Sequence, residues 1–197
     1  MLRIFYPVLV FIFFIFTSCS KDYVPKPKGY NRLDLPQPSY RELEERFPYT
    51  FEYSRYSVIK KDNSSIAEPY WINVYYPSFD ADIQLTYKPL FSKIDHKRLE
   101  ELIDDSYKLA NKHQVKAYSI EENIIKTPSG KSAVVIELTG DVPSPFQFYL
   151  TDSSENFMRG AVYFKSTKID SLSPSIEYMK KEVMHLINTF EWRKAKK

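Results

Sequence analysis

The sequence predicts an α+β domain built on a single antiparallel sheet of about six strands, with two amphipathic helices packed against it. Paired runs of β-branched and aromatic residues are joined by short turns, and strands connected in this way pair antiparallel. Two other segments repeat apolar residues at helical spacing. The 197 residues include 16 Tyr and 14 Phe but only 4 Gly, which favours aromatic strand packing and excludes a Gly-rich phosphate loop.

The amino end has the pattern of an exported protein. Arg3 precedes an apolar run over residues 4–16, and the chain turns polar after Cys19. A helix over this run would reach roughly 20 Å, short of the roughly 30 Å hydrocarbon core of a bilayer. The segment is therefore interpreted as a signal peptide over residues 1–18, cleaved from the mature chain, and not as a membrane span.

Cys19 is the single cysteine of the chain. One cysteine excludes an intrachain disulfide framework and a thiolate-rich metal site. Phe16-Thr17-Ser18-Cys19 resembles the lipobox of bacterial lipoproteins, with Phe16 where Leu is common. This resemblance implies that Cys19 is lipidated and anchors the mature chain to a membrane. The alternative is a plain signal peptide followed by a free or buried thiol.

Residues 19–46 are predicted to form a lipid-anchored, Pro-rich arm. Proline at this density favours an extended path, because it breaks helices and removes backbone donors. A pure spacer would not need Tyr30, Leu33, Leu35 and Tyr40. The arm is either a solvated linker or an extended segment that docks on its own domain or on a partner. In the second case the candidate partner-binding residues are Tyr30, Arg32, Leu33 and Leu35.

The first predicted hairpin and the first predicted helix follow each other along the chain. Residues 70–76 form a β-branched and aromatic run, and residues 82–88 alternate strictly between apolar and polar side chains. The segment 77–80 joins them as a hairpin. Helical spacing then predicts an amphipathic helix over 95–112, with Leu99, Leu102, Ile103, Tyr107 and Ala110 on its apolar side.

Two more hairpins are predicted in the second half. Runs at 115–125 and 133–138 flank a Pro- and Gly-containing turn at 127–130. Runs at 146–150 and 157–165 flank a polar loop, for which an ordinary hairpin connection is favoured over a functional loop.

The last element is predicted to be a helix that begins near Ser173-Pro174, with proline at its first position. Its apolar stripe comprises Ile176, Met179, Val183, Leu186, Ile187 and Phe190. The globular domain is expected to span 47–192, followed by a basic tail over 193–197. The order of hairpin, helix, paired strands and terminal helix resembles the PsbP and Mog1 type of sandwich.

No catalytic constellation, metal site or cofactor site is predicted. Glu182 and His185 have the Glu-x-x-His spacing of carboxylate-bridged metal sites, but such sites need matching carboxylates from other helices. His185 is therefore expected to be a border residue with a half-covered ring. A nucleophile elbow is absent from the sequence. A formal net charge of +3 is too balanced for a protein that holds nucleic acid by charge.

Several segments spread over the mature chain share the pattern of one family. They are Pro-Lys-Pro-Lys-Gly-Tyr-Asn-Arg-Leu-Asp-Leu-Pro at 25–36, Phe-Pro-Tyr-Thr-Phe-Glu-Tyr at 47–53, Glu-Pro-Tyr-Trp-Ile-Asn-Val-Tyr-Tyr-Pro at 68–77, Ile-Gln-Leu-Thr-Tyr-Lys-Pro-Leu at 83–90, Phe-Gln-Phe-Tyr-Leu-Thr-Asp-Ser at 146–153, Arg-Gly-Ala-Val-Tyr-Phe at 159–164 and Thr-Phe-Glu-Trp at 189–192. Together they resemble the gliding motility lipoprotein GldD family of Bacteroidetes.

The resemblance implies an envelope lipoprotein needed for gliding and linked to the type IX secretion apparatus. The resemblance implies no enzymatic activity. Cys19, as the lipidated residue, is the only functional residue that the resemblance assigns by position. We expect a non-enzymatic interaction component whose partners are the membrane and other gliding or secretion lipoproteins or envelope proteins. The expected location is the outer membrane, and its periplasmic side is favoured over the outer surface because no dense acidic run follows Cys19. The alternative is a periplasmic ligand-binding protein or hydrolase acting on cell-wall or lipid components.

Overall fold

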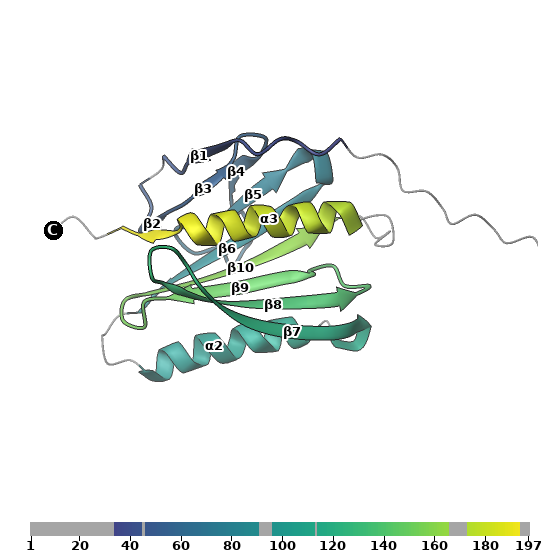
Figure 1. Ribbon diagram of the computed structural model, residues 1–197. Coiled ribbons are helices and arrows are strands. Elements are labelled where there is room, and N and C mark those ends of the chain that lie inside the picture. The colour runs from purple at the N-terminus through teal and green to yellow at the C-terminus, as the bar shows by residue number, and fades with distance from the viewer. Residues whose placement is uncertain (1–33, 45, 91–95, 113, 166–172, 194–197) are drawn as a thin grey trace, which may run out of the picture. The chain divides into compact units, whose positions relative to one another are not determined.

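The computed structural model describes residues 34–44, 46–90, 96–112, 114–165 and 173–193 (Figure 1). Its elements run in the order β1 (Tyr40–Glu42), β2 (Tyr49–Thr50), β3 (Glu52–Ser54), β4 (Val58–Lys61), β5 (Ile72–Tyr76), the 3-10 turn η1 (Pro77–Phe79), β6 (Ala81–Pro89), α2 (His96–Asn111), the 3-10 turn η2 (Gln114–Lys116), β7 (Ala117–Lys126), β8 (Ser132–Gly140), β9 (Phe146–Thr151), β10 (Asn156–Phe164), α3 (Ser173–Thr189) and β11 (Glu191–Trp192).

The main sheet has seven strands in the order β4-β5-β6-β10-β9-β8-β7, and every neighbouring pair is antiparallel. The predicted α+β class with an antiparallel sheet is therefore confirmed. The three predicted hairpins correspond to β5–β6, β7–β8 and β9–β10. Of the seven strands in this sheet, the one that the prediction lacked is β4, whose sequence Val-Ile-Lys-Lys is short and leaves most of its side chains exposed.

Two short two-stranded ladders lie beside the main sheet. Strand β1 pairs with β3, and β2 pairs with β11 at the carboxyl end. In the second ladder Trp192 lies opposite Tyr49, and Arg193 N then donates to Pro48 O at 2.8 Å. The β2–β11 ladder therefore attaches the segment before the main sheet to the segment after it.

The turn between β7 and β8 has the predicted geometry. Gly130 adopts a φ of +80°, which disfavours a side chain. Thr127 N donates to Lys131 O at 2.8 Å, and Gly130 N donates to Thr127 O at 2.9 Å. The glycine therefore permits the tight reversal that joins the two strands.

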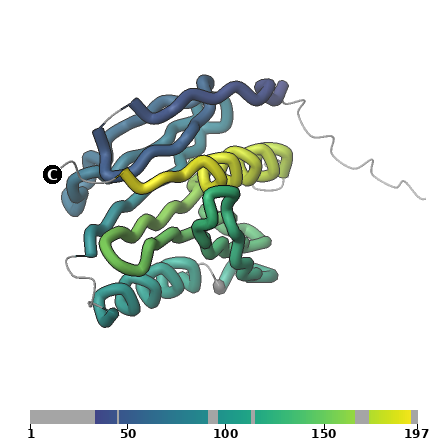
Figure 2. The backbone as a smooth tube through the Cα atoms, turned by 60° about the vertical axis from the view of Figure 1, so that its left-hand side comes forward, coloured from purple at the N-terminus to yellow at the C-terminus, as the bar shows by residue number. Residues whose placement is uncertain are grey.

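The two helices cover opposite faces of the sheet. Along β9, Phe148 and Leu150 share a core with α3, whereas Tyr149, on the other face, packs with α2. The strands β8 and β9 lie between the two helices in both views (Figures 1 and 2). Helix α2 contacts β9 and β10, and it also packs against side chains of β8. Within the described residues, no helix is both long and apolar enough to span a membrane.

The largest core lies between α3 and the sheet. Met179, Val183, Leu186 and Ile187 form the buried stripe of α3, as the sequence predicts. Rings from the segment 49–53 and from the residue directly after α3 close this core, and they are Tyr49, Phe51, Tyr53 and Phe190. The segment that leads into the sheet therefore packs against the last helix, and this junction forms the candidate functional site.

Candidate functional site

The predicted site residues fall mostly outside the part of the chain that the structure describes. Cys19, Tyr30, Arg32 and Leu33 lie outside it. Leu35 lies within it, and 43% of its surface is exposed. Residues 34–44 form the described end of the predicted arm, and their contacts attach it to the domain.

The end of the predicted arm is packed against the domain. Strand β1 pairs with β3 in a register that sets Tyr40 opposite Ser54. Arg55 supports the strand twice, because its backbone N–H donates to Ser39 O at 2.8 Å and its Nε donates to Tyr40 O at 3.0 Å. Leu43 is fully buried in the main core. Of the two alternatives for the arm, docking on its own domain thus describes its last residues.

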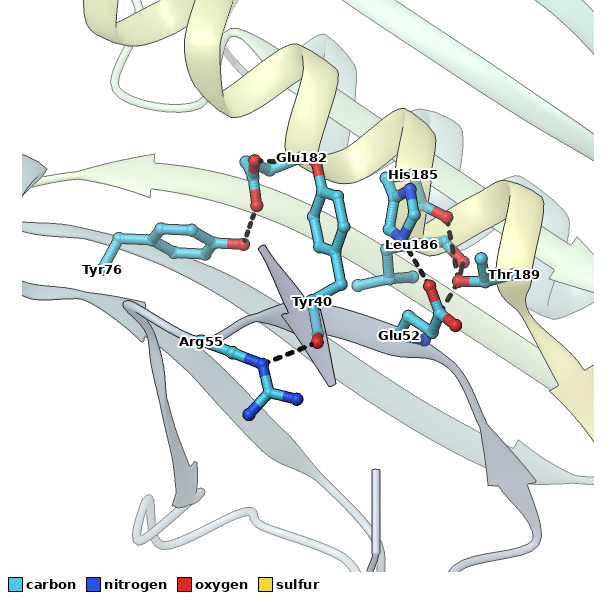
Figure 3. Close-up of polar contacts among 8 residues, drawn as sticks. All are labelled: Tyr40, Glu52, Arg55, Tyr76, Glu182, His185, Leu186 and Thr189. Carbon is cyan, nitrogen blue, oxygen red and sulfur yellow. Dashed lines mark hydrogen bonds and ion pairs between the residues drawn. The ribbon is translucent and has the colours of Figure 1, made fainter. Parts of the chain in front are cut away.

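Tyr40 joins this strand to α3 (Figure 3). Its ring stacks on the ring of His185, with centroids 3.5 Å apart and planes 12° apart. Its hydroxyl donates to Glu182 Oε1 at 3.2 Å. Because Glu182 and His185 are separated by three positions on one helix, they lie on the same helix face, and a single ring can contact both.

Glu182 is a buried carboxyl group held by tyrosines. Only 4% of its surface is exposed. Tyr76 from β5 donates to its second oxygen, Oε2, at 3.0 Å. A buried carboxyl group is costly unless its oxygens accept hydrogen bonds, and the two hydroxyl groups meet this requirement. The cluster therefore links β1, β5 and α3 through one residue.

The environment of Glu182 raises the pKa of the surrounding tyrosine hydroxyls. Burial, together with the nearby Glu182, raises the pKa of Tyr40 to about 12. The same two causes raise the pKa of Tyr178 to about 12 and also raise the pKa of Tyr76. All three hydroxyls therefore keep their protons at neutral pH, where those of Tyr40 and Tyr76 donate to Glu182, and none of the three is a tyrosinate nucleophile or base there.

His185 and Thr189 attach α3 to β3. His185 Nε2 lies 2.8 Å from Glu52 Oε2. Thr189 Oγ1 donates to His185 O at 2.9 Å and accepts from Glu52 N at 3.0 Å. His185 is half-buried, as expected of a border residue. Among the described residues, no group of three or more His, Cys, Asp or Glu side chains is arranged to hold a metal ion.

Sequence patterns indicate only part of this junction. Tyr40 stands out in sequence as an aromatic residue in a Pro-rich arm, and Glu182 and His185 stand out by their spacing. Their association could not be foreseen, because Tyr40 and Glu182 are 142 positions apart. Glu52 and Tyr76 carry no local signal of this role, since each lies in an ordinary run of strand residues.

Comparisons with known proteins add to this geometry. The model of the family described as gliding motility lipoprotein GldD matches residues 20–192. A comparison with curated proteins found no match. Among solved structures, the solution structure of cyanobacterial PsbP (CyanoP) from Synechocystis sp. PCC 6803 is similar with a TM-score of 0.49. The alignment covers 81% of this chain and 95% of that chain, at 10% sequence identity.

Proposed function

Since the chain belongs to the gliding motility lipoprotein GldD family, we propose that it acts as a non-enzymatic structural and interaction component of the gliding and type IX secretion machinery. The family match over residues 20–192 is the observation that carries this proposal. It includes the arm as well as the domain. The arm and the domain are therefore both assigned to the functional part of the protein.

The anchor of this component is Cys19. Lipid chains attached to this residue hold the protein at a bilayer surface, because each buried methylene contributes about 0.8 kcal/mol and two or three chains make release slow. The proposed location is the outer membrane, with the domain facing the periplasm. The arm is the covalent connection between this anchor and the sheet.

The junction at Tyr40 supports a structural role. A component that holds partners at a membrane needs a firm connection between its anchor and its domain. The β1–β3 pairing, the two Arg55 contacts and the Tyr40 contacts with Glu182 and His185 supply such a connection. The raised pKa of Tyr40 makes its proton harder to remove, which suits a structural contact better than proton transfer.

The interaction role is assigned to the arm before this junction, at Tyr30, Arg32, Leu33 and Leu35. The exposed fraction of Leu35, 43%, supports this assignment, because an exposed apolar side chain next to a docked strand is available to a partner. Partners in this proposal are other envelope lipoproteins or membrane proteins of the same machinery.

Crosslinking and affinity purification from envelope fractions test the interaction role. Wild-type protein is compared with Leu35→Asp and with Ile66→Asp, a control at an exposed apolar residue in the β4–β5 loop. We expect Leu35→Asp to lose crosslinked partners that wild type and Ile66→Asp retain. Identical crosslinks from all three proteins would contradict the role of the arm. Labelling with palmitate, in wild type and Cys19→Ala, tests the anchor separately.

A further inference from the structure

Strand β7 carries large apolar side chains on its surface. Tyr118 and Ile124 are 87% and 72% exposed, and Ile120 is also exposed. In the described part of the chain, β7 is an edge of the main sheet and pairs only with β8. Natural edge strands are usually short or covered, whereas β7 spans Ala117–Lys126. This combination of length, exposure and apolar side chains indicates a surface that a partner covers.

The outer edge of β7 presents backbone groups at alternate residues. Thr127 N donates to Lys131 O, and hydrogen-bonded pairs alternate along an antiparallel ladder. Counting back from this pair, Ile120 and Ile124 occupy non-hydrogen-bonded positions opposite β8. Leu138, the partner of Ile120, supports this assignment. Its N–H donates to Pro145 O on the β9 side and therefore does not point toward β7. Ile120, Glu122 and Ile124 therefore direct their N–H and C=O groups away from β8.

The side chains of these three residues share one face of the sheet. Their partners on β8 are Leu138, Ile136 and Val134, all of which pack on the α2 side. Tyr107 of α2 donates to Glu122 Oε1 at 2.8 Å, which places this helix beside the strand. A strand added to β7 would thus contact the apolar side chains of Ile120 and Ile124 next to α2.

The negative charge at the centre of β7 indicates which kind of strand could pair with its outer edge. Glu121 and Glu122 are both exposed, and they lie on opposite faces of the strand. Antiparallel pairing with a second copy about this centre would set glutamates opposite glutamates, and like charges directly opposite each other destabilise a strand pair. A strand with basic residues at the same positions would be attracted instead.

We propose that the outer edge of β7 binds an extended segment of a partner protein as an added antiparallel strand. The segment carries apolar side chains opposite Ile120 and Ile124, and two adjacent basic side chains opposite Glu121 and Glu122. This inference rests on the proposed function as an interaction component and names the chemistry of one of its partners. It involves a different surface from the arm.

A synthetic peptide with the sequence Thr-Val-Thr-Lys-Lys-Val-Thr-Phe tests the proposal on the full chain without its signal peptide. In the expected register, its two Val residues lie opposite Ile124 and Ile120, and its Lys residues lie opposite Glu122 and Glu121. Binding is followed by NMR chemical-shift changes. We expect saturable binding, with the largest changes in the backbone amides of 118–126. A control peptide with Glu in place of both Lys should bind weakly.

Matched variants locate the binding surface. Ile124→Lys should weaken peptide binding roughly tenfold or more, whereas Ile66→Lys, at an equally exposed isoleucine in the β4–β5 loop, should not. Glu121→Lys should weaken binding of the basic peptide, and Glu100→Lys on the exposed side of α2 should leave it unchanged. The folded state of each variant is verified by its unfolding midpoint. Failure of the peptide to bind, or equal binding to all variants, would overturn the proposal.

Photo-crosslinking in cells then shows whether β7 contacts another protein or a second copy of this chain. A crosslinker at position 124 should give a product with another protein that a crosslinker at position 66 does not give. A product that contains two copies of this chain would overturn the proposal in favour of self-association. If position 124 gives no product while the Leu35-dependent crosslinks persist, this inference fails and the proposed function stands. If the Leu35-dependent crosslinks are absent but β7 binds its partner, the arm's assigned role fails instead.

Discussion

The ring of Tyr40 stacks on the ring of His185, with their centroids 3.5 Å apart, so the described end of the arm is attached to the last helix of the domain. The two residues are brought together by β1–β3 pairing on one side and by the Glu52–His185 contact on the other. The same tyrosine reaches Glu182 through its hydroxyl. A load applied to the arm would therefore reach α3 through specific side-chain contacts.

The first prediction concerns the Tyr40 hydroxyl. Tyr40→Phe keeps the stacked ring but removes a donor from the buried Glu182, and it should lower the free energy of unfolding by about 1–2 kcal/mol. Tyr118→Phe, at a strongly exposed tyrosine, should change it by less than about 0.5 kcal/mol. Urea unfolding measures both. Equal stability of Tyr40→Phe and wild type would show that the hydrogen bond to Glu182 contributes nothing.

The second prediction concerns the contact between β3 and α3. A double-mutant cycle with Glu52→Gln and His185→Gln should give a small coupling energy, about 0.2–1 kcal/mol, because both side chains are partly exposed. The coupling should shrink as salt is added. Additive effects of the two substitutions at low salt would argue against an interaction between these side chains.

The third prediction follows from the raised pKa of Tyr40. The folded protein holds the Tyr40 proton up to a pKa of about 12, against 10.0 for an unperturbed tyrosine. The resulting stabilisation is complete below pH 10 and is lost as the pH rises toward 12, since the unfolded state releases this proton first. Tyrosinate absorbance and stability are measured together over this range. Tyr40→Phe should show a shallower alkaline loss, and an identical loss in both proteins would contradict the assignment.

The fourth prediction concerns the centre of the sheet. A Cβ atom added at Gly160 would lie 2.1 Å from Cζ of Phe148, which is itself buried. Gly160→Ala should therefore destabilise the domain by about 1–3 kcal/mol through overpacking. The double variant Gly160→Ala with Phe148→Leu should recover part of this loss relative to the two single variants. Full additivity in thermal or urea unfolding would exclude this steric conflict.

Local periodicity was sufficient to predict much of the fold. The alternation in β6 and the stripe Met179, Val183 and Ile187 in α3 arise from side chains that face the core, and the signals are therefore present in short windows of sequence. The reversal between β7 and β8 could also be predicted locally, because its turn requires a positive φ and Gly130 supplies it.

The parts that could not be predicted depend on long-range partners. Strands β2 and β11 have two residues each, and Trp192 pairs with Tyr49 only because α3 returns the chain to that place. The burial of Glu182 likewise depends on Tyr40 and Tyr76, which come from two other elements. Gly160 gave no sequence signal, because the ring that excludes a side chain there belongs to β9.

In the proposed role, a lipid-anchored domain serves gliding as a structural and interaction component. Its most direct test is the gliding of cells that lack the gene and are complemented with either wild type or Cys19→Ala, expressed at equal levels. We expect wild type to restore gliding and Cys19→Ala, which is exported but not lipidated, to fail to restore it. Full gliding with the unlipidated protein would contradict it.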